Sequence, residues 1–245
     1  MPRWRSAAAR RLIDFAGTSS VNAAIQEIGR RLTSDQTDPP VNLEQIFPKL
    51  DVISCYADNS LRIAGELRRA DNGLEIAYSV HDDESRRRFT IAHEIGHAIF
   101  ERTGSHCPRH GVELESLCDR LAAEILIPRA MLRTNSDVMG INEIGRLSRL
   151  FKCSLTSMAV RLGDVGNVVT FGSEFGEVSW HCGTGRTQIV RPRAQFKSVA
   201  SFADEMPRGR EVCTIETREG GTSEFVAEWC STGLDRKLFV LTRVH

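Results

Sequence analysis

Two histidines and a glutamate in the middle of the chain have the types and spacing of a metal-dependent hydrolytic centre. His93 and His97 are four positions apart and Glu94 follows the first of them, in the pattern H-E-x-x-H. On an α-helix these histidines share one face, about 6 Å apart along the axis, so both can bind one Zn²⁺. Glu94 can then take a proton from a water molecule on the open side of the metal.

A second acidic cluster offers the third ligand. Glu115 and Asp119 follow His97 and are themselves four residues apart, so they share a helix face. Glu115 can complete a His₂Glu zinc site that leaves the fourth position to water, and Asp119 can accept the spare N–H of a ligating histidine. Glu113 and Glu124 compete as ligands, but both are rotated off the Glu115 face, and we expect them to face solvent.

The loop between these two helices contains three further candidates. The thiolate of Cys107 could occupy the fourth zinc position and keep the site latent, although a free, partly exposed thiol is the simpler interpretation. His106 and His110 are candidate donors to the oxyanion of a tetrahedral intermediate. A separate metal site made from these three residues is disfavoured, because Pro108 constrains so short a loop.

The elements around the motif predict an α+β domain. The helix that contains Gly96 is apolar almost all round, so it should be buried, and the glycine is explained if another backbone approaches it closely. Strands are predicted over residues 51–56, 61–67 and 74–80, the last two joined by a turn at residues 71–73. We expect strand 74–80 to edge the cleft and to bind a substrate backbone by strand addition. Further helices are predicted over residues 3–32, 41–50, 112–127, 141–151 and 154–162.

Two longer stretches carry a resemblance to a known family. Residues 88–97 read R-F-T-I-A-H-E-I-G-H, and residues 115–128 read E-S-L-C-D-R-L-A-A-E-I-L-I-P. Together with the pattern of residues 144–162, they resemble the ImmA/IrrE family of metallopeptidases over about residues 40–162. The chain departs from the family at Cys118-Asp119, where Ala-Asn is common, and the aspartate keeps the ability to accept a histidine proton. The resemblance implies a zincin-like catalytic domain with a helical bundle and a small sheet.

The same resemblance implies a regulatory zinc endopeptidase. Members typically cleave a partner helix-turn-helix repressor at one site, which relieves repression of stress or phage-defence genes, and some respond to DNA damage. The competing hypothesis is a non-proteolytic sensor or DNA-binding regulator, whose zinc site would be structural and closed by four protein ligands. A third hypothesis combines the two as a protease that single-stranded DNA activates at the C-terminal part.

The predicted secondary structure changes from mainly helical to mainly β after Gly163. Short strands are predicted over residues 168–171, 178–181, 188–190, 212–217, 225–230 and 238–244, with one helix near residues 196–206. We place a boundary near residue 165, which gives a metallopeptidase domain over residues 1–165 and a β-rich α+β domain over residues 166–245. The second domain would suit a sensor.

The composition argues against several other classes of protein. The 245 residues have no net charge, so no overall field attracts the protein to nucleic acid or to anionic lipid. No run approaches the roughly 20 apolar residues of a membrane span, and no apolar signal-peptide core is present. Seven cysteines without a C-x-x-C pair fit a reducing compartment, so we expect a cytoplasmic protein. The arginines of the first helices are interpreted as a solvated helix face, and helices 141–162 as a scaffold beside the zinc helices, both in preference to DNA contacts.

Overall fold

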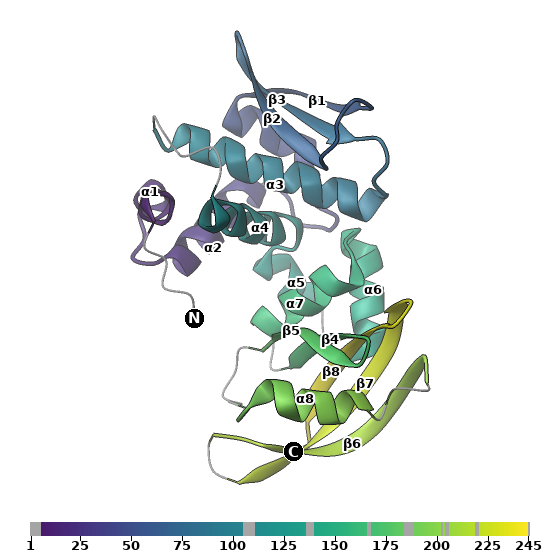
Figure 1. Ribbon diagram of the computed structural model, residues 1–245. Coiled ribbons are helices and arrows are strands. Elements are labelled where there is room, and N and C mark those ends of the chain that lie inside the picture. The colour runs from purple at the N-terminus through teal and green to yellow at the C-terminus, as the bar shows by residue number, and fades with distance from the viewer. Residues whose placement is uncertain are drawn as a thin grey trace. The chain divides into compact units, whose positions relative to one another are not determined.

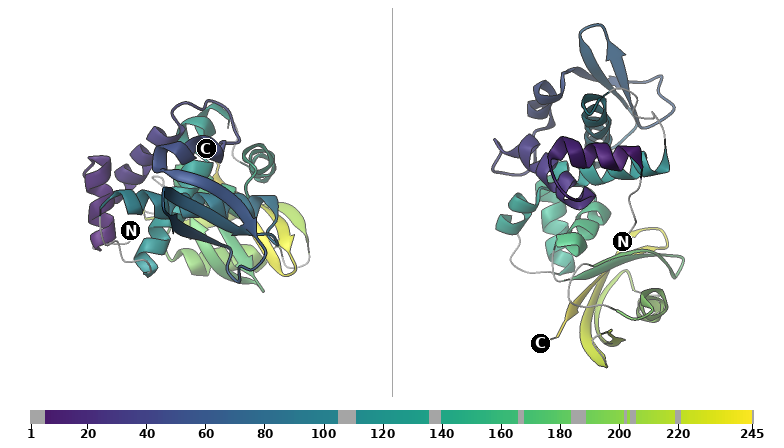
Figure 2. Two further views of the ribbon diagram at one scale, coloured as in Figure 1. Left: turned by 90° about the horizontal axis from the view of Figure 1, so that it is seen from above. Right: turned by 90° about the vertical axis from the view of Figure 1, so that its left-hand side faces the viewer.

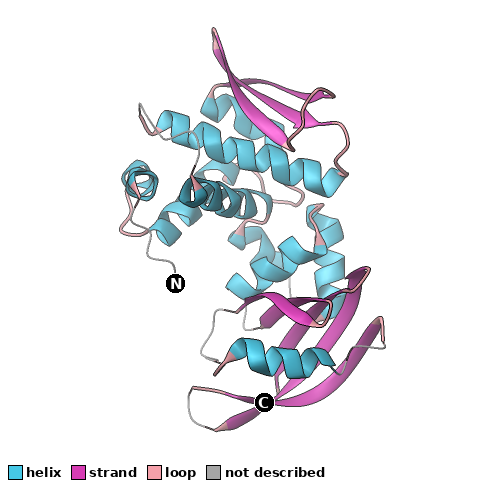
Figure 3. Cartoon of the chain, in the orientation of Figure 1, coloured by secondary structure: helices cyan, strands magenta, loops and turns pink. Residues whose placement is uncertain are grey.

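The computed structural model describes residues 6–104, 111–135, 140–165, 168–183, 189–201, 203, 206–218 and 221–244. The chain divides into two compact units. The first comprises residues 1–134 with 150–153, and the second comprises residues 135–149 with 154–245. Both units mix helices and strands, as Figure 3 shows, which confirms the predicted α+β class. The domain boundary near residue 165 stays a prediction.

The first unit combines a helical bundle with a small sheet. Its elements are α1 (Ala7–Ala16), α2 (Val21–Thr33), the 3-10 helix η1 (Leu43–Leu50), β1 (Val52–Asp58), β2 (Gly65–Ala70), β3 (Gly73–Ser79), α3 (Glu84–Arg102), α4 (Val112–Leu126) and α5 (Arg129–Asn135). The strand order is β1-β3-β2, with β1 parallel and β2 antiparallel to β3. The predicted hairpin is present, because Ala70 pairs with Gly73 across a two-residue turn.

The strand that forms the edge of this sheet differs from the prediction. β3 was expected to edge the cleft, but it has β1 on one side and β2 on the other, so it is the central strand. β2 is the edge strand beside α3 (Figures 1 and 2). The order of the strands along the chain could not reveal this, because the parallel pairing of β1 with β3 is a long-range choice.

Helices α3 and α4 cross at a glycine. α3 begins after Asp83, whose side chain accepts a hydrogen bond of 2.8 Å from the amide of Arg86 and caps the helix. A Cβ atom at Gly96 would lie 3.0 Å from Cα of Cys118 on α4, which is closer than almost all Cβ contacts, so a side chain there would push the two helices apart. The predicted close approach of a second backbone at Gly96 is therefore confirmed, and it fixes the position of α4 against α3.

Two glutamates of α4 are not the solvent-facing residues that the sequence predicted. Glu124 is buried, 3 % exposed, and its carboxylate lies 3.7 Å from Nε of Arg129. Glu113 is half-buried, and its carboxylate accepts a hydrogen bond of 3.1 Å from the amide of Ser6 ahead of α1. Both side chains serve contacts between helices, which the rotation of the helix alone could not predict.

The second unit is built on a five-stranded sheet. It contains most of α6 (Ile141–Phe151), α7 (Leu155–Val165), β4 (Val169–Glu174), β5 (Glu177–Cys182), α8 (Pro192–Ser201), β6 (Arg208–Glu216), β7 (Thr222–Gly233) and β8 (Arg236–Arg243). The strand order is β5-β4-β8-β7-β6, antiparallel throughout. The strand predicted over residues 188–190 is reduced, among the described residues, to a single bridge between Ile189 and Thr217.

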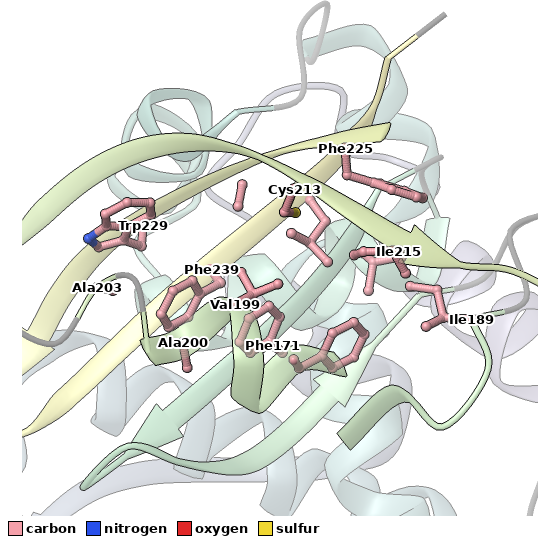
Figure 4. Packing of buried hydrophobic residues seen from close by; sticks show 14 residues of the cluster. Phe171, Ile189, Val199, Ala200, Ala203, Cys213, Ile215, Phe225, Trp229 and Phe239 are labelled. Atoms are coloured by element: carbon pink, nitrogen blue, oxygen red, sulfur yellow. The ribbon is translucent and has the colours of Figure 1, made fainter. Parts of the chain in front are cut away.

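An aromatic stack forms the core of this second unit. The ring of Phe171 lies between those of Phe196 and Phe239, with centroids 4.6 and 4.4 Å apart. Figure 4 shows Phe171 and Phe239 with Trp229 between the sheet and α8.

Arg161 of α7 is only 5 % exposed, so it cannot face DNA, and this burial favours the scaffold interpretation of helices 141–162. Among the described residues, no helix has the length and apolar character needed to cross a membrane.

Candidate metal centre

Three donor atoms from α3 and α4 converge on one point of the first unit. Nε2 of His93 lies 3.2 Å from Nε2 of His97, one helical turn along α3. A carboxylate oxygen of Glu115, on α4, lies 3.1 Å from Nε2 of His93 and 3.6 Å from Nε2 of His97. Helical spacing brings the two imidazoles together, and the crossing of α4 at Gly96 supplies the carboxylate.

The size of this triangle fits a tetrahedral metal. Zinc binds imidazole nitrogen and carboxylate oxygen at about 2.0–2.2 Å, so two ligand atoms of a tetrahedral site lie about 3.3 Å apart. The three observed separations, 3.1, 3.2 and 3.6 Å, surround that value. The spacing of these atoms of His93, His97 and Glu115 would therefore suit three ligands of a tetrahedral metal, and all three residues line one cleft.

Asp119 orients the first histidine. Its carboxylate lies 2.9 Å from Nδ1 of His93, and it is placed one turn after Glu115 on α4. A hydrogen bond at Nδ1 fixes the ring so that Nε2 presents its lone pair to the triangle. Burial lowers the pKa of His93, but the hydrogen bond with Asp119 and the neighbouring carboxylate charges outweigh it and raise that pKa overall.

Glu94 lies beside the triangle on the side of β2. It is only 7 % exposed, and burial raises the pKa of its carboxyl to about 7. The backbone of Leu67 on β2 forms a hydrogen bond with it. A Cβ atom at Gly65 would lie 2.4 Å from the methyl group of Thr90 and 3.4 Å from Cγ of Glu94. Glycine at this position lets β2 approach α3 and enclose the carboxylate.

A cleft of about 1060 Å³ opens above these residues. Its walls are β2 with the two residues before it, one face of α3, and the start of α4. The amide of Ser79 donates to the carbonyl of Ala64, and such pairs recur at every second residue of an antiparallel ladder. The backbone groups of Gly65, Leu67 and Arg69 therefore point away from β3, toward the free edge of the sheet.

Cys118 is a nearby residue that sequence reasoning did not place at the site. It is fully buried on α4, and its sulfur lies within 4.8 Å of ring nitrogens of His93 and His97. The sequence indicated only a departure from the family pattern at this position. A helical wheel could have found it, because position 118 is three residues after Glu115 and close to the same face.

The three loop candidates, Cys107, His106 and His110, lie outside the described residues. The structure therefore says nothing about the proposed fourth ligand or the proposed oxyanion donors. The remaining candidates, His93, Glu94, His97, Glu115 and Asp119, all line the single cleft described above.

Comparisons with known proteins agree with this geometry. A search of curated protein sequences finds no matching relative. Among solved structures, the chain is similar to a Mycobacterium tuberculosis transcriptional regulator, with a TM-score of 0.58 and 14 % identity over 96 % of this chain and 80 % of that one. The model of the IrrE N-terminal-like domain, Peptidase M78, matches residues 60–163. This match contains the whole donor triangle, and it confirms the resemblance to the ImmA/IrrE family that the sequence indicated.

Proposed function

We propose that this protein is a zinc-dependent endopeptidase that cleaves a partner helix-turn-helix repressor, and so relieves repression of stress or phage-defence genes. The observation that carries the proposal is the triangle of His93, His97 and Glu115, whose edges match a tetrahedral metal with one open corner. A structural zinc site would be closed by four protein ligands and would not need Glu94. The geometry therefore favours catalysis over the purely structural alternative.

The residues of the site have separate roles in this proposal. His93, His97 and Glu115 would hold the zinc, which when bound supplies a Lewis acid and lowers the pKa of its water. Glu94 accepts the proton of the attacking water and passes it to the leaving amine. Burial between β2 and α3 keeps this carboxylate next to the open corner and away from bulk solvent. Asp119 holds the ring of His93 in the orientation that ligation requires.

The free edge of β2 is the proposed binding surface for the substrate backbone. An extended peptide could pair there with the groups of Gly65 and Arg69 that point away from β3, and with the carbonyl of Leu67, whose amide is bonded to Glu94. Such pairing uses hydrogen bonds to the peptide backbone of the substrate, so the segment that binds must be unfolded or locally opened. This requirement suits a single cut in a repressor better than broad digestion.

The regulatory part of the proposal has independent but coarser support. The similar solved structure is that of a transcriptional regulator. The second unit has its own aromatic core, so it is a separately packed part of the protein that could bind a signalling ligand. A response to DNA damage belongs to the proposal on the family resemblance alone, and activation by single-stranded DNA stays a separate hypothesis.

Incubation with a candidate repressor tests the whole proposal. The substrate to try first is any small helix-turn-helix protein encoded next to this gene. We expect one discrete cut by the zinc-loaded protein, loss of cleavage after treatment with a chelator, and recovery when Zn²⁺ is restored. Cleavage that persists in the chelated protein, with metal content verified, would contradict zinc catalysis.

A spectroscopic prediction concerns the ligand set. The Glu115 oxygen lies 3.1 Å from Nε2 of His93 and 3.6 Å from Nε2 of His97, close to the edge of about 3.3 Å of a tetrahedral zinc site, so we assign it as the third ligand. The sulfur of Cys118, within 4.8 Å of the histidine nitrogens, is the competing donor. X-ray absorption of the zinc-loaded protein should show nitrogen and oxygen at about 2.0–2.1 Å and no sulfur at about 2.3 Å. Cys118→Ala should leave zinc affinity unchanged. A sulfur shell that Cys118→Ala removes would instead make Cys118 a ligand.

A further inference from the structure

Among the arginines that line the cleft, all but one form ion pairs with residues that the structure describes. Arg68 is paired with Asp58 and Glu66 at 3.0 Å, and Arg69 is paired with Glu101 across the cleft between β2 and α3. The acidic groups at the centre surround the histidines. These partnerships leave little free charge at the Arg69 end of the cleft.

Arg86 is the exception. It lines the cleft and is exposed, and its guanidinium forms no ion pair or hydrogen bond with any residue that the structure describes. The two acids just before it are engaged elsewhere: Glu84 pairs with Lys152 at 2.8 Å, and Asp83 is the N-cap and accepts hydrogen bonds from the amide of Arg86 and the hydroxyl of Ser85. An exposed arginine on the wall of a cleft presents a planar set of donors that suits a carboxylate.

Helical geometry fixes the distance along α3 between Arg86 and His93, beside which the scissile bond would lie. Arg86 precedes His93 by seven residues, which is almost two full turns, so both residues lie on one face of α3. Seven residues span about 10.5 Å along the axis. An extended peptide advances about 3.3 Å per residue, so Arg86 lies opposite the third residue from the scissile bond.

The direction of β2 indicates on which side of the bond that residue lies. Gly65 lies against Thr90 and Glu94, and Arg69 reaches Glu101, so β2 runs in the same direction as α3. Antiparallel pairing with an edge strand is the more stable arrangement. A peptide antiparallel to β2 would therefore enter at the Glu101 end and leave, with its C-terminal part, at the Arg86 end.

We propose that Arg86 is a specificity-determining residue, which binds an acidic side chain about three residues after the scissile bond of the substrate. This proposal rests on the proposed endopeptidase function and narrows its substrate class. The aromatic ring of Phe89 and the side chain of Ile63, which is 59 % exposed, line the same end of the cleft. The acidic residue should therefore have an apolar neighbour in the substrate.

A peptide library tests the proposal without knowledge of the natural repressor. The zinc-loaded full-length protein would be incubated with a proteome-derived library, and the cleaved bonds would be mapped by mass spectrometry for wild type, Arg86→Ala and Arg86→Glu. Arg87→Glu is the matched control, because Arg87 packs over the ring of Tyr78 at 5.9 Å and is absent from the cleft walls. A second arm would measure which library peptides the Glu94→Gln protein retains.

Aspartate and glutamate should be enriched about 2- to 5-fold at the third position after the cut, the range of an exposed ion pair. Arg86→Ala should remove this enrichment, Arg86→Glu should replace it with lysine and arginine, and Arg87→Glu should keep it. Identical cleavage profiles in wild type and both Arg86 variants would overturn the proposal for Arg86 and leave the endopeptidase intact. Retention of acidic peptides without any cleavage would support the role of Arg86 in binding and contradict the endopeptidase. A library that is neither cleaved nor retained would overturn both.

Discussion

Glu94→Gln should abolish peptide cleavage while zinc remains bound. Glutamine keeps the size of the side chain and can still accept the hydrogen bond from the backbone of Leu67, but it cannot take a proton from the attacking water. Removal of a general base costs about 10²- to 10⁴-fold in rate. Zinc content should not change, because the donor triangle does not include this residue.

The measurement for Glu94→Gln pairs the rate of repressor cleavage with zinc stoichiometry and the midpoint of thermal unfolding. Glu101→Gln is a suitable control, because Glu101 also lines the cleft from α3 but pairs with Arg69 instead of facing the histidines. We expect the control to cleave at close to the wild-type rate. Undiminished cleavage by Glu94→Gln would exclude the proposed mechanism, and undiminished gene regulation without cleavage would favour the sensor hypothesis.

Helix α3 was predictable because its constraints are local. The spacing of His93 and His97, the burial of the helix around them and the need for a close backbone at Gly96 all follow from helix geometry and hydrophobic pattern. The partners on the second helix were predictable for the same reason, because Glu115 and Asp119 share a face. The structure places both beside the histidines, at 3.1 and 2.9 Å from His93.

The predictions that were wrong concern contacts between elements that are distant in the sequence. Pairing of β1 with β3 made β2 the edge strand, and no pattern within the three strands distinguishes these orders. Glu124 is charged but buried because Arg129 and the packing of α4 accommodate it. Cys118 looked like a simple substitution in a motif, and only the crossing at Gly96 brings its sulfur close to the histidines. Local sequence describes the face of a helix, whereas the partner of that face depends on the whole fold.

Glu115→Ala should cause the largest loss of zinc affinity among substitutions on α4. The variant would leave two histidine ligands, and the triangle that matches a tetrahedral site would lose one corner. Loss of a residue that only orients a ligand already costs about 10- to 100-fold in affinity. Loss of a ligand should exceed this, so we expect a decrease of more than about 100-fold, with Asp119→Ala inside the smaller range.

Competition with a chromophoric chelator measures this affinity without any substrate, and it separates Glu115 from its neighbour Cys118. If Glu115 is the third ligand, Glu115→Ala should lose zinc while Cys118→Ala keeps it, and the double variant should resemble Glu115→Ala. Near-normal affinity in Glu115→Ala, abolished only when Cys118 is also replaced, would show that the sulfur can substitute for the carboxylate. A thiolate carries the same charge as a carboxylate but is a softer ligand, so that outcome would also require a new account of how the open corner activates water.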